Sequence, residues 1–264
     1  MPPLLLALLL SLPPVEAAEP PPQRVLRVCA DPNNLPFSNQ QEEGLENRLA
    51  RLLARELGAR VEYTWWAQRR GFVRNTLKAG LCDVVMGVPR DYELALTTRP
   101  YYRSSYVFVS REEAGPPVRS FDDVRLRRLR IGLHVVGDDA AAVPPAHALS
   151  RRGIVDNVRG YSLYGDYRQD SPPQDLLRAL ERGEVDVAVV WGPLAGYFAK
   201  HSQAKLRLAP VAAHAKDAHL PFAFDISLGV RRGQDALKRE LERALAHRQR
   251  EVQQLLADYG VPRP

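Results

Sequence analysis

Aromatic rings and guanidinium groups lie close together in the stretch YTWWAQRRGF, residues 63–72. Trp66, Arg69 and Arg70 could stack on a planar ligand, pair with an anion or bind another protein, because Trp and Arg are enriched at binding hot spots. Packing of both tryptophans in a core is the alternative interpretation. Side chains alternate along a strand, so Trp65 is expected to point toward the core and Trp66 toward a site.

The titratable residues elsewhere form no recognisable catalytic or metal-binding motif. His201, His214 and His219 share a polar region with Asp217, which is more typical of a surface loop than of a metal site. The sequence has no GxSxG motif, no P-loop and no dinucleotide-binding glycine fingerprint. We therefore predict no catalytic, cofactor-binding or metal-ligating residues, and a protein that is not an enzyme.

Cys29 and Cys82 are the two cysteines of the chain and lie 53 positions apart. This spacing excludes a CxxC redox pair and a zinc knuckle. A disulfide and two buried free thiols are equally compatible with the sequence, because a bridge requires Cα atoms within about 7 Å of each other.

Residues 1–17, MPPLLLALLLSLPPVEA, have the features of a signal peptide, with an apolar run, two prolines and small residues before a cleavage site after Ala17. The apolar run is much shorter than the ~20 residues that a membrane span needs. We expect a monomer that is exported to the periplasm and does not associate with a membrane.

The formal net charge of +6 comes mainly from arginines that are spread along the chain. A dispersed basic charge favours a solvated surface or attraction of an acidic protein partner. Nucleic-acid binding would require basic residues gathered in one stripe, so we predict no nucleic-acid partner.

Strand and helix patterns alternate and occur twice along the chain. Buried-strand text at residues 25–30, 60–65 and 83–88 is separated by helical text, and the pattern returns at 130–135 and 185–190. Ser171-Pro172-Pro173-Gln174 reads as a helix-capping box before the last helix of the second copy. This order predicts an α/β protein made of two lobes, each a mostly parallel sheet flanked by helices.

The C-terminal part predicts one more strand at residues 224–230 and a single long amphipathic helix after it. We expect this part to pack on the first lobe. The first lobe then comprises residues 24–110 and 222–264, and the second comprises 111–221. The chain would cross between the lobes twice, near Ser110 and near residues 212–222, as a hinge requires.

This order of elements resembles the type II periplasmic solute-binding fold, and specific strings resemble the MxaJ and XoxJ proteins, which are associated with the quinoprotein dehydrogenases of methanol oxidation. The resemblance covers nearly all of the mature chain. Its strings are LRVCADPNNLPFSN (26–39), VEYTWWAQRRGFVRNTLKAGLCDVVMGVP (61–89), TTRPYYRSSYVFV (97–109), PPAHALSRRGIVDNVRGY (144–161), VDVAVVWGPLAGYFA (185–199) and LADYGVP (256–262).

The resemblance implies a periplasmic accessory protein of a PQQ-dependent methanol dehydrogenase, of the calcium or lanthanide type (MxaF or XoxF). It implies binding of the dehydrogenase, with activation and maturation both open as the outcome, and the c-type cytochrome of the system as a further partner. It implies neither catalysis nor a cofactor held by this chain.

Ligands of open α/β sheets lie outside the carboxyl ends of the parallel strands, which predicts the residues of the cleft and its rim. Core packing or sealing of the hinge is the alternative for the aromatic residues among them. The predicted cleft or partner-binding residues are Asn33, Asn34, Phe37, Trp66, Arg69, Arg70, Arg90, Asp91, Tyr101, Tyr102, His134 and Trp191.

Similarity to amino-acid receptors of the same fold argues against an amino-acid ligand. Those receptors hold the α-carboxylate with an arginine and the ammonium with an aspartate, and aligned by hand these positions are Asp91 and Trp191 here. A zwitterion would leave its charges unpaired, so we expect an aromatic and arginine-lined groove that suits a planar anion, an inserted protein loop or no ligand.

Two other functions remain open at this point. A solute receptor for an ABC transporter would bind a small ligand. A dehydratase on the same fold would need a buried acid in the cleft, and Glu46 and Asp91 are the candidates.

Overall fold

The computed structural model describes residues 24–136, 143–163, 171–212 and 214–262. The predicted signal peptide, residues 1–17, lies outside these residues. Within the described part of the chain, no helix is long and apolar enough to cross a membrane.

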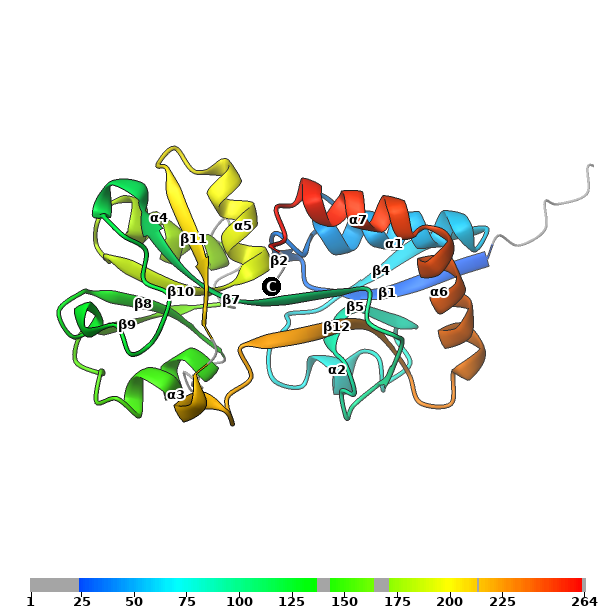
Figure 1. Ribbon diagram of the computed structural model, residues 1–264. Coiled ribbons are helices and arrows are strands. Elements are labelled where there is room, and N and C mark those ends of the chain that lie inside the picture. Colours follow the sequence, from blue (N-terminus) through cyan, green and yellow to red (C-terminus); the bar gives the residue numbers. More distant parts are fainter. Residues whose placement is uncertain (1–23, 137–142, 164–170, 213, 263–264) are drawn as a thin grey trace, which may run out of the picture.

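Two lobes lie side by side and share one continuous ten-stranded sheet, as Figure 1 shows. Its main strand order is β4-β1-β5-β12-β7-β10-β8-β9, with β6 beside β12 and β11 beside β7. The strands of the first lobe are β1 (Arg24–Ala30), β4 (Ala59–Trp65), β5 (Val84–Pro89), β6 (Leu96–Thr97) and β12 (Ala223–Val230). Those of the second are β8 (Ile131–Val135), β9 (Val158–Ser162), β10 (Val187–Trp191) and β11 (Leu206–Pro210).

Helices cover both faces of each half of the sheet (Figure 1). On the first lobe, α1, α6 and α7 pack on one face and α2 on the other, and on the second lobe α4 and α5 lie opposite α3. Their bounds are α1 (Leu45–Glu56), α2 (Phe72–Asn75), α3 (Pro144–Ser150), α4 (Asp175–Glu181), α5 (Gly192–His201), α6 (Asp235–His247) and α7 (Gln249–Asp258). Short 3₁₀ turns lie at 112–114, 124–127, 172–174 and 215–217.

The long strand β7 (Tyr102–Arg111) connects the two lobes. Its first residues, up to Ser105, pair with β12, and from Tyr106 onward it pairs with β10 and β11. The chain therefore passes from one lobe to the other between Ser105 and Tyr106. The lobe boundaries expected from the sequence, 24–110 with 222–264 and 111–221, stay a prediction.

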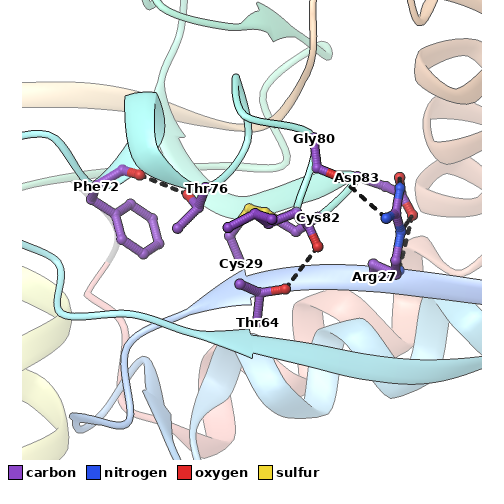
Figure 2. Close-up of a disulfide and its surroundings, with 9 residues drawn as sticks. Arg27, Cys29, Thr64, Phe72, Thr76, Gly80, Cys82 and Asp83 are labelled. Atoms are coloured by element: carbon purple, nitrogen blue, oxygen red, sulfur yellow. Dashed lines mark hydrogen bonds and ion pairs between the residues drawn. A yellow bond between two sulfur atoms is a disulfide. The ribbon is translucent and has the colours of Figure 1, made fainter.

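The sequence pattern that occurs twice corresponds to one parallel unit in each lobe. In both units an Arg–Asp ion pair connects the first and last strands. In the first lobe, Arg27 on β1 forms a two-pronged ion pair with Asp83, with 2.6 Å between Nη2 and Oδ1 (Figure 2). In the second lobe, Arg130 pairs with Asp186 in the same way, also at 2.6 Å. Each arginine precedes its aspartate by 56 positions, so the repeat is built into the pairing geometry.

A disulfide joins Cys29 to Cys82, with the two Cα atoms 5.5 Å apart (Figure 2). It ties β1 to the segment that leads into β5. The equivalent positions of the second lobe, counted from its own arginine and aspartate, are Gly132 and Val185. There a Cβ on Gly132 would lie 3.4 Å from Val185 Cγ2, so packing replaces the covalent link.

Two local predictions are wrong. Ser171 does not cap a helix: its backbone is left-handed, with φ of 50°, and its buried hydroxyl has no hydrogen-bond partner among the described residues. The C-terminal helix is not continuous, because Arg248 leaves helical geometry between α6 and α7, with ψ of 21°. This break allows α7 to pack beside α1, while α6 covers the end of the first lobe (Figure 1).

A second interlobe contact lies where α5 meets the C-terminal end of α7 and the segment that follows it. The Lys200 ammonium on α5 donates to the carbonyl oxygens of Ala257 and Asp258, at 2.7 and 3.1 Å. The rings of Tyr197 and Tyr259 stack with centroids 5.6 Å apart. These contacts bind the C-terminal end of the first lobe to the second lobe.

Candidate functional site

A cavity of about 300 Å³ lies between the two lobes. Residues of the first lobe supply most of its wall, and residues on or near β7, β8, β10 and α5 close it from the second lobe. Its lining residues are Asn34, Phe37, Glu46, Gln68, Gly87, Val88, Pro89, Tyr102, Tyr106, Val136, Leu163, Trp191, Leu194, Phe224 and Ile226.

Strand alternation and strand ends bring these side chains together. Tyr102 and Tyr106 lie four positions apart on β7 and therefore face the same side of the sheet. Trp191 ends β10 and Phe224 lies near the start of β12. Both strands are neighbours of β7, so their rings reach the same cavity.

The rings form an aromatic wall with edge-to-face geometry. Trp191 contacts Tyr106 and Phe224, with ring centroids 5.5 and 5.7 Å apart and planes inclined by 64° and 72°. Burial raises the pKa of Tyr106 to about 12 and also raises the pKa of Tyr102, so both phenols stay neutral. The wall is therefore apolar, uncharged and rich in π-electrons.

Glu46 is the one carboxylate among the described residues that line the cavity. It lies in the first turn of α1, and burial followed by the nearby Asp31 raises its pKa to about 7. Gly87 on β5 leaves room for it, since an added Cβ would collide with Glu46 Oε1. The carboxyl group thus occupies a space that only a glycine at position 87 provides.

The side chain of Asn34 has a hydrogen-bond acceptor, Oδ1, that no described donor reaches. Its side chain is buried, and its Nδ2 donates to Gln68 Oε1 at 3.0 Å, which fixes the orientation of the amide. Gln68 is held in turn, because its backbone N–H donates to Asp31 Oδ2 at 2.6 Å. The opposite atom, Asn34 Oδ1, has no hydrogen-bond partner in the described part of the chain.

Four of the predicted cleft residues line this cavity together: Asn34, Phe37, Tyr102 and Trp191. Phe37 also packs against the core of the second lobe. This cavity has no arginine among its described lining residues, so it does not combine aromatic and arginine side chains.

The two arginines of the opening stretch line a separate groove beside the cavity. Arg69 and Arg70 lie there with Arg74, in a space of about 650 Å³. The groove and the cavity share part of their walls, including Gln68 and Pro89. Trp66 lines neither space and is 44% exposed.

The other predicted residues lie at the rim or in structural contacts. Arg90 and Asp91 form an exposed ion pair at 3.4 Å, and neither lines the cavity. Asn33 Oδ1 accepts a hydrogen bond from the Ser171 backbone at 3.3 Å and so bridges the lobes. Tyr101 donates its hydroxyl to the Met86 carbonyl oxygen at 2.9 Å.

His134 is buried and does not line the cavity. Its Nε2 lies 3.0 Å from the carbonyl oxygen of Pro173. Burial lowers the pKa of His134 to about 4, so the ring is neutral at physiological pH and has a packing role.

Most residues that line the cavity are not among those predicted from the sequence. Tyr106, Phe224 and Leu194 were not selected, because they are ordinary strand and helix residues and their shared position depends on β7 crossing between the lobes. The sequence indicates Glu46 only as a candidate acid of a dehydratase. One sequence feature could have indicated that Glu46 lines the cavity. It lies in the first turn of α1, on the buried face of that helix, where an apolar residue would be expected.

The described residues contain no group of three or more His, Cys, Asp or Glu side chains that could hold a metal ion. Asp217, which was weighed with the three histidines, is instead paired with Arg152, at 2.8 Å between Oδ1 and Nη1. The described lining residues therefore offer one carboxyl group, the side-chain oxygen of Asn34, the Gln68 side chain and aromatic walls.

Comparison with known proteins identifies relatives over almost the whole chain. The family of bacterial extracellular solute-binding proteins, family 3, matches residues 26–261. Protein MoxJ of Methylorubrum extorquens strain AM1 is 33% identical over 260 residues, which cover 94% of this chain and 84% of MoxJ.

Two solved structures share both the fold and the sequence similarity. The periplasmic binding protein XoxJ of Methylobacterium extorquens AM1 is 32% identical with a TM-score of 0.74, covering 90% of this chain and 99% of XoxJ. MxaJ of Methylophaga aminisulfidivorans MPT is 26% identical with a TM-score of 0.79 and the same coverage. The predicted two-lobed α/β fold of the periplasmic binding proteins is confirmed.

Proposed function

The chain belongs to family 3 of the bacterial extracellular solute-binding proteins and is of the MxaJ/XoxJ type, and from this premise we propose a periplasmic accessory role in methanol oxidation. The resemblance read from the sequence is thereby confirmed. In the proposed role, the protein binds a PQQ-dependent methanol dehydrogenase of the calcium or lanthanide type and is itself not catalytic. The c-type cytochrome of that system is a further proposed partner.

The composition of the cavity is the observation that carries this proposal. Receptors for amino acids need a cation for the ligand's carboxylate, and the described lining residues offer none. A carboxylate placed there would face the Glu46 side chain across an apolar space. The family's fold is therefore retained while its usual ligand chemistry is lost, which favours a different task.

We propose that the groove and the cleft rim form the contact region for the dehydrogenase. Arg69, Arg70 and Arg74 gather there, and the exposed Trp66 lies close to them in the sequence. A basic groove on a chain of net charge +6 favours an acidic patch on the partner. Exposed arginine and tryptophan side chains also supply the usual hot-spot residues.

Purification of the native dehydrogenase and measurement of its affinity for this protein test the proposal. We expect a complex whose Kd rises with ionic strength, because exposed charges are screened. The double variant Arg69→Ala with Arg70→Ala should weaken binding about tenfold or more, as should Trp191→Ala if the cleft itself is engaged.

A matched control removes two arginines elsewhere. Arg239 and Arg243 lie exposed on α6, so Arg239→Ala with Arg243→Ala removes the same charge and should leave the affinity nearly unchanged. A complex that persists unaltered in all of these variants would reject the contact region. Absence of any complex with the native dehydrogenase at low salt would reject the partner.

A solute receptor for a transporter is a second candidate, and the cavity of about 300 Å³ favours it. A receptor would bind a small ligand and be stabilised by it through mass action.

A dehydratase would use Glu46 as its acid, but the carboxylate of a hydroxy-acid substrate would find no cation among the described lining residues. Turnover of no hydroxy acid by the purified protein is therefore expected.

A further inference from the structure

We propose that the interlobe cavity binds the ammonium group of a small alkylamine, with Glu46 as countercharge, Asn34 Oδ1 as hydrogen-bond acceptor and the aromatic wall around the alkyl chain. This inference goes beyond the proposed accessory role and does not rest on it. The aromatic wall consists of Tyr102, Tyr106, Trp191 and Phe224.

The sign of the ligand's charge follows from the charges around the cavity. The Glu46 carboxyl has no hydrogen bond or ion pair to any described residue, and no Lys or Arg lies among the described lining residues. The nearest acid, Asp31, adds a second negative charge to this region and accepts backbone hydrogen bonds from Asn33 and Gln68. A cation would compensate the charge of Glu46, whereas an anion would meet repulsion.

The need for a hydrogen-bond donor follows from Asn34. Its amide cannot rotate to satisfy Oδ1, because Nδ2 is already bound to Gln68. A buried acceptor without a donor is unfavourable, so a ligand that brings an N–H gains binding free energy there. A primary ammonium has three N–H donors and can serve Asn34 and Glu46 at once.

The walls favour a cation with an apolar chain. Aromatic faces attract cations through their quadrupoles, and five aromatic residues, the four of the aromatic wall and Phe37, are among the described residues that line this cavity. Leu163, Leu194 and Val88 add aliphatic surface for an alkyl group. A volume of about 300 Å³ equals that of roughly ten water molecules, which limits the ligand to a small amine.

Calorimetric titration of the purified protein at pH 8 with three probes of equal chain length tests the inference. The probes are n-butylammonium chloride, the neutral analogue 1-butanol and the anion butyrate, with sodium chloride matched throughout. We expect n-butylammonium to bind at least tenfold more tightly than 1-butanol, and butyrate not to bind. Equal affinity for ammonium and alcohol, preference for butyrate, or no binding of n-butylammonium would overturn the proposal.

Variants assign the affinity to the two polar groups. Glu46→Gln keeps the shape of the side chain and should weaken n-butylammonium binding at least tenfold, and Asn34→Leu should weaken it severalfold. Glu93 is exposed and outside the cavity, so Glu93→Gln removes the same charge and should have no effect. Circular dichroism confirms that each variant is folded. Full ammonium affinity in Glu46→Gln would refute the assignment.

The same ammonium chemistry occurs in a free amine and in a lysine side chain of a docked protein. Nα-acetyl-lysine N-methylamide distinguishes the two sources, because it carries the butylammonium group on a peptide backbone. We expect it to bind at least tenfold more weakly than n-butylammonium, which identifies a free amine as the ligand. Equal or tighter binding would overturn the assignment to a free amine and identify a protein side chain.

Discussion

Gly196 on α5 and Gly260 after α7 bring backbone segments of the two lobes into direct contact. A Cβ on Gly260 would lie 2.8 Å from the carbonyl oxygen of Gly196, and one on Gly196 would collide with the carbonyl of Gly260. The contact lies beside the Lys200 hydrogen bonds and the stack of Tyr197 on Tyr259. The lobes are thus held together by a backbone contact in addition to the strand that crosses between them.

Replacing Gly196 tests this interlobe contact. Gly196→Ala should lower the free energy of unfolding by about 2–3 kcal/mol, because the added methyl group must displace backbone rather than a flexible side chain. Urea denaturation measures the loss. X-ray scattering should also show a larger radius of gyration if the lobes separate.

A glycine with open space around it is the control for Gly196→Ala. Gly58 has φ of +61° and nothing within 4 Å of an added Cβ, so Gly58→Ala costs only its backbone strain of about 1 kcal/mol. A Gly196→Ala protein as stable as Gly58→Ala, with an unchanged radius of gyration, would show that the lobes are not fixed by this contact.

Removal of the disulfide should destabilise the first lobe. The bridge closes a loop of 53 residues, for which loss of chain entropy in the unfolded state predicts about 4 kcal/mol. The double variant Cys29→Ala with Cys82→Val uses side chains close to the Gly132 and Val185 that occupy the equivalent positions of the second lobe. Guanidinium denaturation of both proteins measures the difference.

Reduction provides the control for the disulfide prediction. Dithiothreitol should lower the stability of the wild-type protein by a similar amount and leave the double variant unchanged. Equal stability of the oxidised wild type and the double variant would mean that the bridge contributes nothing.

The Glu46 carboxyl should make stability depend on pH. Its pKa rises from the ordinary 4.5 to about 7 in the folded protein, so the folded state holds the proton more tightly than the unfolded state. The stability that the protonated Glu46 contributes is fully present below pH 4.5. It is lost as the pH rises through 7, and the loss amounts to up to about 3 kcal/mol. Glu46→Gln should therefore match the wild type at pH 4.5 and exceed its stability at pH 8.

Titrating groups that do not interact with Glu46 cancel in that comparison, because both proteins carry them. Asp31 and Tyr102 lie near Glu46. Burial lowers the pKa of His134 to about 4, so the stability that its neutral ring contributes changes in the opposite direction: it is lost as the pH falls from 6.5 toward 4. Denaturation curves from pH 4.5 to 8 measure the difference. A constant difference between the two proteins would disprove the raised pKa of Glu46.

The buried ion pair of Arg152 with Asp217 should be essential to the second lobe. Both side chains are almost inaccessible, at 8% and 2% exposure, and Arg152 also pairs with Asp122. Asp217→Ala should cost about 3 kcal/mol, because it leaves a buried guanidinium with one partner fewer. Glu184→Ala breaks the exposed pair with Arg182 and should cost less than about 1 kcal/mol. Similar losses in the two variants would contradict this ranking.

The sequence identified the lining of the interlobe cavity only in part, and the reason is visible in particular residues. Asn34 and Phe37 follow β1 and Trp191 ends β10, so the strand-end rule found them, whereas Tyr102 begins β7 and lies outside that rule. Arg69 and Arg70 also follow a strand, yet the turn after Trp66 directs them into the neighbouring groove. The rule gives the edge of a sheet but not the direction of a side chain in a loop.

The sequence by itself determined the two α/β lobes, because periodicity and turns are local properties of the chain. Only the tertiary structure decided that Glu46, Asn34 and the rings of Tyr106 and Phe224 face one cavity, with no arginine among its described lining residues. Their meeting depends on β7 crossing between the lobes and on Gly196 packing against Gly260. Contacts between residues so distant in sequence arise from packing of whole elements, which no local pattern encodes.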